Sequence, residues 1–331
     1  MKAAVLERFS EPLAVREVPA PRPAEGEALV RVRATGICGT DLKITSGSFG
    51  SALPLIPGHE VAGDVVEADG SSSVGERVAC YIYETCGRCR WCRSGRTTLC
   101  PGRVRLGFER DGGLAEYVAV REENLLRLPA PVSYAGAAIA MDAIAVPWMA
   151  LHRRARIEAG QSVVVAGAGG LGMHAIQIAR AAGCSVAAVD PLPAHLARAR
   201  ELGAELTVPP EEADRIAAWA DDGVDVALET SGARGGFDAA ARCVRRGGRI
   251  VCCGYHPGVE YGLDSRRLVL EEIEILGSVN ASIDAARAAL DAIADASVEP
   301  QIADRESLDG ANSALARLAA GDVLGRVVVE A

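Results

Sequence analysis

The sequence is poor in aromatic residues and carries no excess of positive charge. Aromatic side chains make up 4% of its 331 residues, whereas hydrophobic residues make up 49%, enough for sizeable apolar cores. The net charge is −9 and the pI is near 5.2, so the chain lacks the basic face that nucleic-acid binding requires. The length is typical of about two domains. We therefore expect a two-domain globular protein without a nucleic-acid partner.

The sequence also lacks a long uninterrupted apolar run. Arg, Glu, Asp or Gly interrupts each hydrophobic stretch before it reaches the length of a membrane span, so we expect no membrane partner. Met1 to Leu6 enters an alternating strand pattern directly, without the regions of a secretory signal peptide. These observations predict a cytoplasmic protein. Its ten cysteines then indicate metal or thiol chemistry, because disulfides are rare in that compartment.

The most informative stretch runs from Ser162 to Asp190. Residues 163–166 form a short apolar run typical of a buried parallel strand, and residues 173–182 have the composition of a helix. Between them, glycines stand in G-x-G-x-x-G spacing at Gly167, Gly169 and Gly172. Such glycines permit a tight turn, a close approach of backbone to a pyrophosphate, and close packing of helix on strand. With a second strand at 185–189, this pattern predicts a dinucleotide site.

Asp190 ends that second strand and stands 18 residues after Gly172. An acidic residue at this place accepts hydrogen bonds from a ribose 2′-hydroxyl, which favours NAD(H) over NADP(H). The next three residues are Pro191, Leu192 and Pro193, so no arginine directly follows Asp190 to bind a 2′-phosphate. His195 and Arg198 are the nearest cationic candidates, and one of them could soften the preference.

Four cysteines in one short segment have the spacing of a metal site. The segment reads Cys86-Gly-Arg-Cys89-Arg-Trp-Cys92, and Cys100 follows eight residues later. Four thiolates close the shell of Zn²⁺ and give a structural site with no open position for chemistry. An iron–sulfur cluster is the alternative, because Cys100-Pro101 resembles the end of a ferredoxin motif, but the last spacing in that motif is shorter. We expect zinc, whose thiolate charge is offset by Arg88, Arg90, Arg93 and Arg96.

Three further residues are candidate zinc ligands by type. Cys38 and His59 lie in glycine-flanked segments, where functional residues concentrate, and zinc prefers thiolate and imidazole. Asp142 is the only charge in residues 135–151, and an ionised carboxylate in apolar surroundings is costly unless it is paired or metal-bound. A buried thiol, a packed histidine, and a capping or salt-bridged aspartate are the alternatives, which the residues alone leave open.

Together these features resemble the zinc-dependent members of the medium-chain alcohol dehydrogenase superfamily. The resemblance rests on motifs along the whole chain: Cys38-Gly39-Thr40-Asp41, Gly58-His59-Glu60, the four-cysteine segment, Asp111-Gly112-Gly113, the glycine-rich turn and Gly325-Arg326. It implies an α/β protein in which residues 1–142 and 279–331 form a GroES-like, β-rich catalytic domain. Residues 143–278 would form a doubly wound parallel Rossmann domain, and the alternation of strands and helices after residue 185 favours this independently.

The resemblance also assigns roles to individual residues. It implies that Cys38, His59 and Asp142 hold a catalytic zinc, with Glu60 as a neighbouring group or alternate ligand, so that the chain would bind two zinc ions. Thr40 would bind the substrate oxygen and pass on its proton. The implied cofactor-binding residues are Gly167, Gly169, Gly170, Leu171, Gly172 and Asp190, with Ser278 and Val279 against the nicotinamide and Arg326 on the pyrophosphate.

Lys43 departs from the family pattern, because many members have a histidine there that continues the proton path. A free lysine has a pKa of about 10.4, too high for efficient proton exchange near neutrality unless nearby positive charge lowers it. We therefore favour water as the proton carrier over Lys43.

We expect an oxidoreductase that transfers a hydride between NAD(H) and a small-molecule, secondary alcohol or ketone. One alternative is a zinc-containing biosynthetic reductase of an activated C=C or C=N bond, which the lysine at position 43 would suit. The other is a non-catalytic dinucleotide sensor, against which the intact Cys38, His59 and Thr40 argue. The resemblance implies a homodimer or homotetramer, often paired through the last Rossmann strand. Four residues could line the substrate pocket or belong to the core: Phe49, Tyr81, Ile82 and Trp148.

Overall fold

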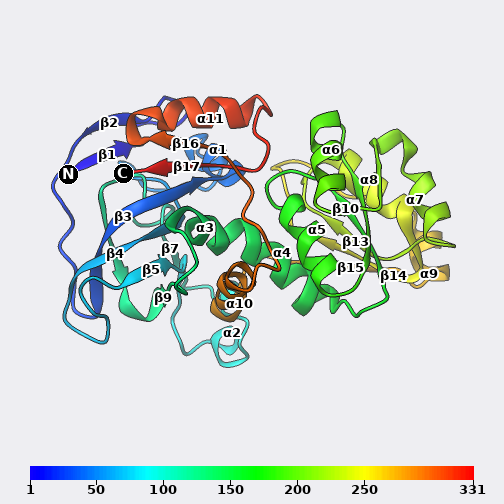
Figure 1. Cartoon of the computed structure of the whole chain (residues 1–331), viewed down its shortest axis with the longest axis horizontal. Coiled ribbons are helices and arrows are strands. Elements are labelled where there is room, and N and C mark those ends of the chain that lie inside the picture. The colour runs from blue at the N-terminus through cyan, green and yellow to red at the C-terminus, as the bar shows by residue number, and fades with distance from the viewer. The chain divides into compact units, whose positions relative to one another are not determined.

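The computed structural model describes the whole chain, Met1 to Ala331, which divides into two compact units (Figure 1). The first unit comprises Met1–Asp142, Ala281–Ala294 and Ile302–Ala331, and the second comprises Ala143–Asn280 and Asp295–Gln301. One unit is β-rich and the other contains a parallel sheet with helices. The predicted fold class is therefore confirmed.

A seven-stranded sheet forms the framework of the first unit. Its order is β16-β17-β3-β4-β5-β9, and β8 pairs with β3. Buried and more accessible residues alternate along the first half of β3, as expected for a strand with one face on the core. The strands are β3 (Glu27–Ile37), β4 (Glu60–Ala68), β5 (Arg77–Cys80), β8 (Tyr117–Arg121), β9 (Leu125–Arg127), β16 (Ile302–Ser307) and β17 (Arg326–Glu330).

Smaller elements complete the first unit, and its last strand returns to its beginning. β17 pairs antiparallel with β3, with Val327 opposite Ile37, so Arg326 comes close to the end of β3. The other elements are the pairs β1 (Lys2–Val5) with β2 (Ala14–Glu17) and β6 (Tyr83–Glu84) with β7 (Val104–Arg105), the helices α1 (Gly39–Thr45), α2 (Arg90–Arg93), α3 (Tyr134–Ile139), α10 (Ile283–Ala294) and α11 (Ala311–Ala319), and the 3₁₀ turns η1 (Thr97–Leu99), η2 (Glu122–Asn124) and η6 (Leu308–Gly310).

The second unit is built on a six-stranded parallel sheet of order β12-β11-β10-β13-β14-β15. The chain moves outward from β10 in one direction and then from β13 in the other, so β10 and β13 flank the switch point. Ligands of such sheets bind at the carboxyl ends of the strands beside that point. The strands are β10 (Ser162–Ala166), β11 (Ser185–Val189), β12 (Leu206–Val208), β13 (Val224–Glu229), β14 (Val244–Cys252) and β15 (Glu274–Gly277).

Helices connect these strands and bury the sheet. An apolar cluster that includes Val164, Phe237 and Ile250 joins α7 and α8 to β10, β13 and β14. The helical elements are α4 (Ala145–Trp148), η4 (Met149–Ala155, a π-helix), α5 (Gly172–Ala181), α6 (Pro193–Glu201), η5 (Pro210–Glu212), α7 (Asp214–Trp219), α8 (Arg234–Cys243) and α9 (Ser265–Leu270).

The segment Asp295–Gln301 belongs to the second unit, although the predicted boundary puts it in the catalytic domain. Two side chains of α5 hold it. Gln177 both donates to the carbonyl oxygen of Glu299 and accepts from its N–H, at 3.0 and 2.8 Å. His174 accepts the N–H of Gln301 on Nε2 at 3.0 Å. Such pairings between residues more than 120 positions apart leave no local signal in the sequence.

One helical stretch, Tyr134–Ala155, is long and apolar enough to cross a membrane, which corrects the expectation that no such run exists. Its apolar window is 83% buried inside the protein, however. Burial on this scale is typical of a core helix, since a helix that is apolar all round must be covered either by protein or by lipid.

Candidate metal centres and cofactor site

Four ligand-type side chains converge in the first unit. The ligand atoms of Cys38, His59, Glu60 and Asp142 all lie within 4.8 Å of one another, and all four residues are buried. Cys38 directly follows β3, and His59 and Glu60 stand where β4 begins. Because β3 and β4 are antiparallel and pair Gly36 with Glu60, the end of one strand meets the start of the other. The sequence predicted each of these four residues as a ligand or its neighbour.

Gly36 is required by this arrangement. A Cβ atom on Gly36 would lie 2.0 Å from Oε2 of Glu60, so any side chain there would displace the carboxylate. Asp142 enters from another direction, because it lies in a π-helical turn, Ala140–Ile144. Single π-helical turns inside longer helices occur frequently at functional sites.

The spacing inside the cluster suits a metal ion. The Cys38 sulfur is 3.3 Å from Oδ2 of Asp142, and the same oxygen is 4.0 Å from Nε2 of His59. Ligands around tetrahedral zinc lie about 3.3–3.8 Å apart, given bond lengths of about 2.0–2.3 Å. A thiol, an imidazole and a carboxylate are also the mixed donor set that zinc accepts in catalytic sites.

Asp41 contacts the side chain of His59 and the backbone of Cys38, a role that the sequence analysis did not predict. Its fully buried carboxylate lies 3.2 Å from Nδ1 of His59 and accepts the N–H of Cys38 at 2.8 Å. Nε2 of His59 is therefore left to face the cluster, as in the carboxylate–histidine pairs of metal sites. Burial alone lowers the pKa of His59, but Asp41 and Cys38 raise it well above its usual value. The available signal was the capping-box position of Asp41, three residues after Cys38.

Arg326 supplies the permanent positive charge of the cluster. Its Nε donates to Oε1 of Glu60 at 3.0 Å and its Nη2 to Oδ2 of Asp142 at 3.2 Å, and its side chain is only 5% exposed. The resemblance assigns Arg326 to the cofactor pyrophosphate, whereas the structure gives its guanidinium these partners in the first unit. The sequence contains the residue but gives no sign of this contact.

One arginine does not balance the buried acidic groups. Burial raises the pKa of Glu60 to about 8, even though Arg326 opposes the shift. In contrast, His59 and Arg326 outweigh burial and lower the pKa of Asp142. Oε2 of Glu60 is buried without a hydrogen-bond partner. An unpartnered carboxylate oxygen beside a thiol and an imidazole fits a bound divalent cation.

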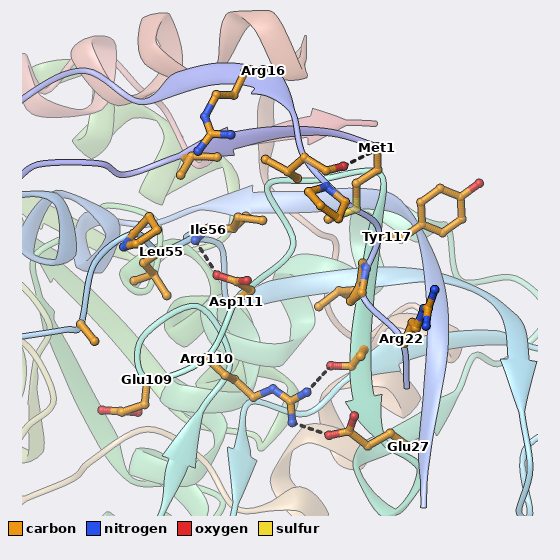
Figure 2. A pocket seen from close by; sticks show the side chains of 18 residues that line it. Met1, Arg16, Arg22, Glu27, Leu55, Ile56, Glu109, Arg110, Asp111 and Tyr117 are labelled. Carbon is orange, nitrogen blue, oxygen red and sulfur yellow. Dashed lines mark hydrogen bonds and ion pairs between the residues drawn. The ribbon is translucent and has the colours of Figure 1, made fainter. Parts of the chain in front are cut away.

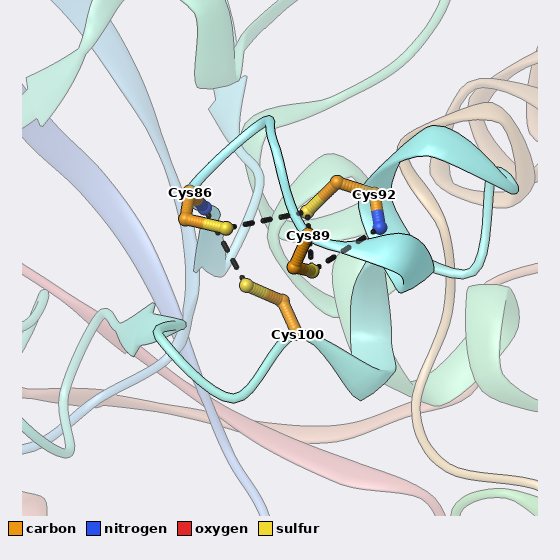
Figure 3. A group of neighbouring side chains, drawn as sticks. All are labelled: Cys86, Cys89, Cys92 and Cys100. Atoms are coloured by element: carbon orange, nitrogen blue, oxygen red, sulfur yellow. Dashed lines mark hydrogen bonds between the residues drawn. The ribbon is translucent and has the colours of Figure 1, made fainter.

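The four cysteines of the second predicted site also converge (Figure 3). The sulfur of Cys92 is 3.5 Å from that of Cys89 and 4.0 Å from that of Cys86, and the Cys86 N–H donates to Cys100 at 3.5 Å. All four thiols are free, and such separations are far longer than a disulfide bond. They match the edges of a tetrahedral zinc site, about 3.8 Å for bonds of about 2.3 Å.

Backbone donors prepare this loop for thiolates. N–H groups of Arg88 and Cys89 lower the pKa of Cys86 to about 6, and the N–H of Cys92 lowers that of Cys89. Burial raises the pKa of Cys92 to about 11, and its hydrogen bond with Cys89 adds to the shift, because that bond favours the protonated form of the Cys92 thiol. A metal ion bound among the four sulfurs would favour the thiolate form of all of them.

The glycine-rich turn of the second unit has the geometry of a phosphate loop. Gly167 adopts a φ of +98°, which favours glycine, and a Cβ on Gly172 would lie 1.9 Å from the carbonyl oxygen of Gly167. A Cβ on Gly169 would meet nothing within 4 Å. The fold itself therefore needs the first and third glycines, whereas Gly169 leaves open space where a ligand can approach. Helix α5 begins at Gly172, so the end of the helix that favours anions directly follows this turn.

Asp190 is buried at the end of β11, as its sequence position predicted for an acidic strand terminus. Its carboxylate accepts the N–H groups of Ala168 and Leu192 at 2.8 and 2.9 Å. Nδ1 of His195 lies 3.2 Å from the same carboxylate. Arg198 instead contacts Gln301 and Glu201. Of the two cationic candidates, only His195 is therefore beside Asp190.

The other predicted residues fall into distinct environments. Ser278 continues the β14–β15 ladder through its N–H, and its hydroxyl is buried without a partner, while Val279 is 44% exposed. Tyr81 and Ile82 are core residues, with the Tyr81 hydroxyl on the carbonyl oxygen of Ala281. The ring of Trp148 lies 4.7 Å from that of His152 and is tilted by 41° relative to it.

Aromatic rings form a wall beside the candidate ligand His59. The ring of Phe108 lies 5.4 Å from the imidazole, and the predicted pocket residue Phe49 packs edge-on against Phe108 at 5.1 Å. The guanidinium of Arg105 covers Phe108 at 4.1 Å and is neutralised by Glu109. The sequence reasoning missed Phe108, which carries no recognisable spacing. The surroundings of this cluster are thus apolar on one side.

A separate cavity of about 590 Å³ also opens in the first unit (Figure 2). Its lining contains Asp111, whose carboxylate accepts the N–H of Ile56 at 2.9 Å, and Arg110, which pairs with Glu27 and Glu84. None of the four clustered ligands lines it. The aspartate of the Asp-Gly-Gly motif therefore holds a loop and takes no part in the metal cluster.

Comparison with known proteins agrees with this geometry. Residues 24–130 match the family model of the alcohol dehydrogenase GroES-like domain, and residues 170–295 match that of zinc-binding dehydrogenases. An alcohol dehydrogenase of Geobacillus stearothermophilus is 36% identical, over 100% of this chain and 99% of its own length. The chain belongs to the zinc-binding, medium-chain alcohol dehydrogenase family.

Solved structures are similar over the full chain as well. An NAD-dependent alcohol dehydrogenase superposes with a TM-score of 0.93 at 29% identity, covering 100% of both chains. Acetophenone reductase from Geotrichum candidum in complex with NAD superposes with a TM-score of 0.87 at 29% identity, covering 100% of this chain and 97% of its own. The protein is accordingly a zinc-dependent, nicotinamide-linked oxidoreductase of alcohols and carbonyl compounds, as the sequence predicted.

The glycines of the phosphate loop predict two opposite phenotypes. Gly172→Ala should lower the free energy of unfolding by about 1–3 kcal/mol, because its methyl group collides with the Gly167 carbonyl. Gly169→Val should leave the midpoint of thermal unfolding nearly unchanged but weaken the binding of NADH at least about tenfold, because the valine side chain fills space that is open to a ligand. Thermal melts and NADH fluorescence titrations of the two variants check this, and equal NADH affinity in Gly169→Val and wild type would contradict it.

Proposed function

We propose that Cys38, His59 and Asp142 hold a catalytic zinc ion, with Glu60 as an alternate ligand. The observation that carries this proposal is the buried cluster itself, with its thiol, imidazole and carboxylate groups and its unpartnered Glu60 oxygen. Zinc bound there supplies a Lewis acid for a substrate oxygen, and the nicotinamide supplies or receives the hydride. The remaining chemistry belongs to the residues around the cluster.

These residues position the ligands and the substrate. Asp41 holds the imidazole of His59 in the orientation that presents Nε2, and Arg326 offsets the charge of Glu60 and Asp142. Phe49 and Phe108 give the substrate an apolar wall. We therefore propose a secondary alcohol or ketone with apolar substituents as the substrate. The reductase of C=C or C=N bonds and the non-catalytic sensor are not favoured, because nothing in the structure recommends either over an alcohol dehydrogenase.

We also propose that the cofactor is NAD(H), held by the turn Gly167, Gly169, Gly170, Leu171 and Gly172. The buried Asp190 supports this choice, because a carboxylate accepts from a ribose 2′-hydroxyl and repels a 2′-phosphate. The hydroxyl of Ser278, buried and unpartnered at the end of β15, is a donor suited to the nicotinamide, with Val279 beside it.

We further propose that the protein is a homodimer or homotetramer and that it is located in the cytoplasm. A homodimer or homotetramer is supported by β15, an edge strand of the parallel sheet, and by the exposed apolar residues beside it, Leu268, Val269, Leu270 and Ile275. Unpaired strand edges and exposed apolar patches are typical of association surfaces. A cytoplasmic location is supported by ten cysteines that are all free.

The proposed reaction is tested by incubating the enzyme with a panel of secondary alcohols and either NAD⁺ or NADP⁺. We expect reduced cofactor to accumulate, with a higher kcat/KM for NAD⁺. Asp190→Asn should lower the ratio of kcat/KM for NAD⁺ to kcat/KM for NADP⁺ by about tenfold, because a neutral amide no longer repels the 2′-phosphate. A higher kcat/KM with NADP⁺ in the wild type would refute the role of Asp190, and inactivity with every alcohol would refute the proposed substrate class.

Two zinc ions per chain are expected, since there are two ligand sets of different character. Cys38→Ser should lose one zinc ion and all activity yet stay folded. Cys89→Ser should mainly lower thermal stability, because a structural zinc contributes its binding free energy to folding. Elemental analysis and thermal unfolding distinguish the two variants. A single zinc ion per chain in the fully active wild type would refute the two-site proposal.

Thr40 and Lys43 lie three residues apart on α1, so their side chains are neighbours on one face of that helix. Burial lowers the pKa of Lys43, although the negative groups of Cys38 and Asp142 oppose this. We propose that Thr40 exchanges the substrate proton and that water, rather than Lys43, carries it onward.

Thr40→Val should therefore lose at least about a hundredfold in kcat, the usual scale for a positioned proton-transfer group. Lys43→Ala should lose much less and leave the pH–rate profile nearly unchanged. The profiles of both variants, measured with saturating alcohol and NAD⁺, decide between the carriers. A loss in Lys43→Ala as large as that in Thr40→Val, with one titration missing from its profile, would make Lys43 the relay.

A further inference from the structure

A fully buried carboxylate at the carboxyl end of β13 has no role in the chemistry described above. Glu229 is the last residue of that strand, is 0% exposed and makes no ion pair. Its Oε1 accepts the N–H groups of Ser231 and Gly232 at 2.8 and 2.9 Å and also the Ser231 hydroxyl. Its Oε2 accepts the hydroxyl of Tyr261 at 2.9 Å. Four hydrogen-bond donors, in place of a cation, thus offset the desolvation cost of burying this carboxylate.

The turn that Glu229 holds is attached to the phosphate loop. Thr230 donates its N–H to Ala166 at 2.9 Å and its hydroxyl to the carbonyl oxygen of Gly167 at 2.6 Å. Gly167 is the first glycine of the G-x-G-x-x-G turn. The geometry of residues 230–232 is therefore passed directly to the backbone that faces the cofactor phosphates.

A second loop, residues 253–262, is attached to Glu229 at both ends. At its start, the N–H groups of Cys253 and Gly254 donate to the backbone oxygen of Glu229 at 2.9 and 3.2 Å. Near its end, Tyr261 donates to the Glu229 carboxylate, and its ring stacks on Phe237 at 4.5 Å. Burial and Glu229 raise the pKa of Tyr261, which keeps its hydroxyl protonated as a donor.

The two loops also touch each other. Gly232 has a φ of +72°, and a Cβ there would lie 2.4 Å from the backbone nitrogen of Tyr255. Likewise, a Cβ on Gly254 would lie 2.3 Å from the nitrogen of Gly232. The three segments that follow β10, β13 and β14 therefore pack closely around the Glu229 carboxylate. They lie at the edge of the sheet where ligands bind.

We propose that Glu229 is a positioning residue for the nicotinamide cofactor, because it holds the 230–232 turn and, through Tyr261, the 253–262 loop in the geometry that receives NAD(H). The inference rests on the proposed function, since it takes the cofactor to bind at the glycine-rich turn. Glu229 acts through the backbone of these loops and does not itself need to touch the cofactor. Loss of its charge should weaken cofactor binding more than the turnover of bound cofactor.

Three variants test this role. Glu229→Gln keeps the size of the side chain but replaces one of its two acceptor oxygens by an NH₂ group. That NH₂ group cannot accept hydrogen bonds, so the loop donors that face it lose their partner. Tyr261→Phe removes a single donor and little volume. Asp225→Asn is the matched control, because Asp225 lies in the same strand, close to its opposite end, and its carboxylate also accepts several donors, from Ser162 and Arg245.

For each variant, the Kd of NADH is measured by fluorescence titration and the midpoint of thermal unfolding by calorimetry. Steady-state kinetics with an alcohol that the wild type oxidises give KM for NAD⁺ and kcat. Glu229→Gln should raise both the Kd of NADH and KM for NAD⁺ about tenfold, with kcat within about twofold, because charge-assisted hydrogen bonds to the loops are weakened. Tyr261→Phe should raise the Kd about threefold. Asp225→Asn should lower the unfolding midpoint without changing the Kd.

A Glu229→Gln variant with the wild-type Kd would overturn the inference, whatever its thermal stability. A Kd that rises equally in Asp225→Asn would overturn it too, since the effect would then follow general loss of stability. If Glu229→Gln does not fold, Tyr261→Phe decides: an unchanged Kd refutes the role, and a raised Kd at wild-type thermal stability supports it. Failure of the wild type to bind NADH would instead refute the proposed function, on which the inference depends.

Discussion

Burial of an acidic ligand set against a single permanent cation is the constraint on which the first unit depends. Cys38, Glu60 and Asp142 come together in a buried cluster, and Arg326 is the one residue there that is always charged. Unpaired charges in such surroundings cost several kcal/mol each. A divalent ion bound by this cluster would offset that cost.

The local structure around the cluster follows from this constraint. Gly36 leaves room for the Glu60 carboxylate, and the π-helical turn at Asp142 lets a helix otherwise made of apolar residues present a single acid. Asp41 combines two tasks, since it caps α1 and fixes the ring of His59. The second unit solves a related problem differently, because Glu229 is buried with hydrogen-bond donors alone. The carboxylate of Glu229 is held by donors from two loops, whereas Glu60 and Asp142 share one arginine.

Features encoded by short spacings could be predicted from the sequence, and features created by distant pairing could not. The glycine-rich turn, the four cysteines and the acidic residue at Asp190 each depend on neighbours within about 30 residues, where strand and turn rules apply. The roles of Asp41 and Arg326 depend on which strands pair, and the position of Arg326 follows only from the β17–β3 register. The segment Asp295–Gln301 is likewise placed by α5, through Gln177 and His174, and no local pattern shows this.

The pairing of β17 with β3 also sets an order for biosynthesis. The ribosome makes β3, β4 and Asp142 first, then the whole sheet of the second unit, and only afterwards the strand that begins with Arg326. Domains generally fold as they emerge, so the parallel sheet is complete while the first unit still lacks its final strand. Until that strand docks, the acidic cluster has neither its arginine nor a closed wall. The acidic cluster of the first unit therefore gains its arginine only at the end of synthesis, after every strand of the second unit's sheet has been made.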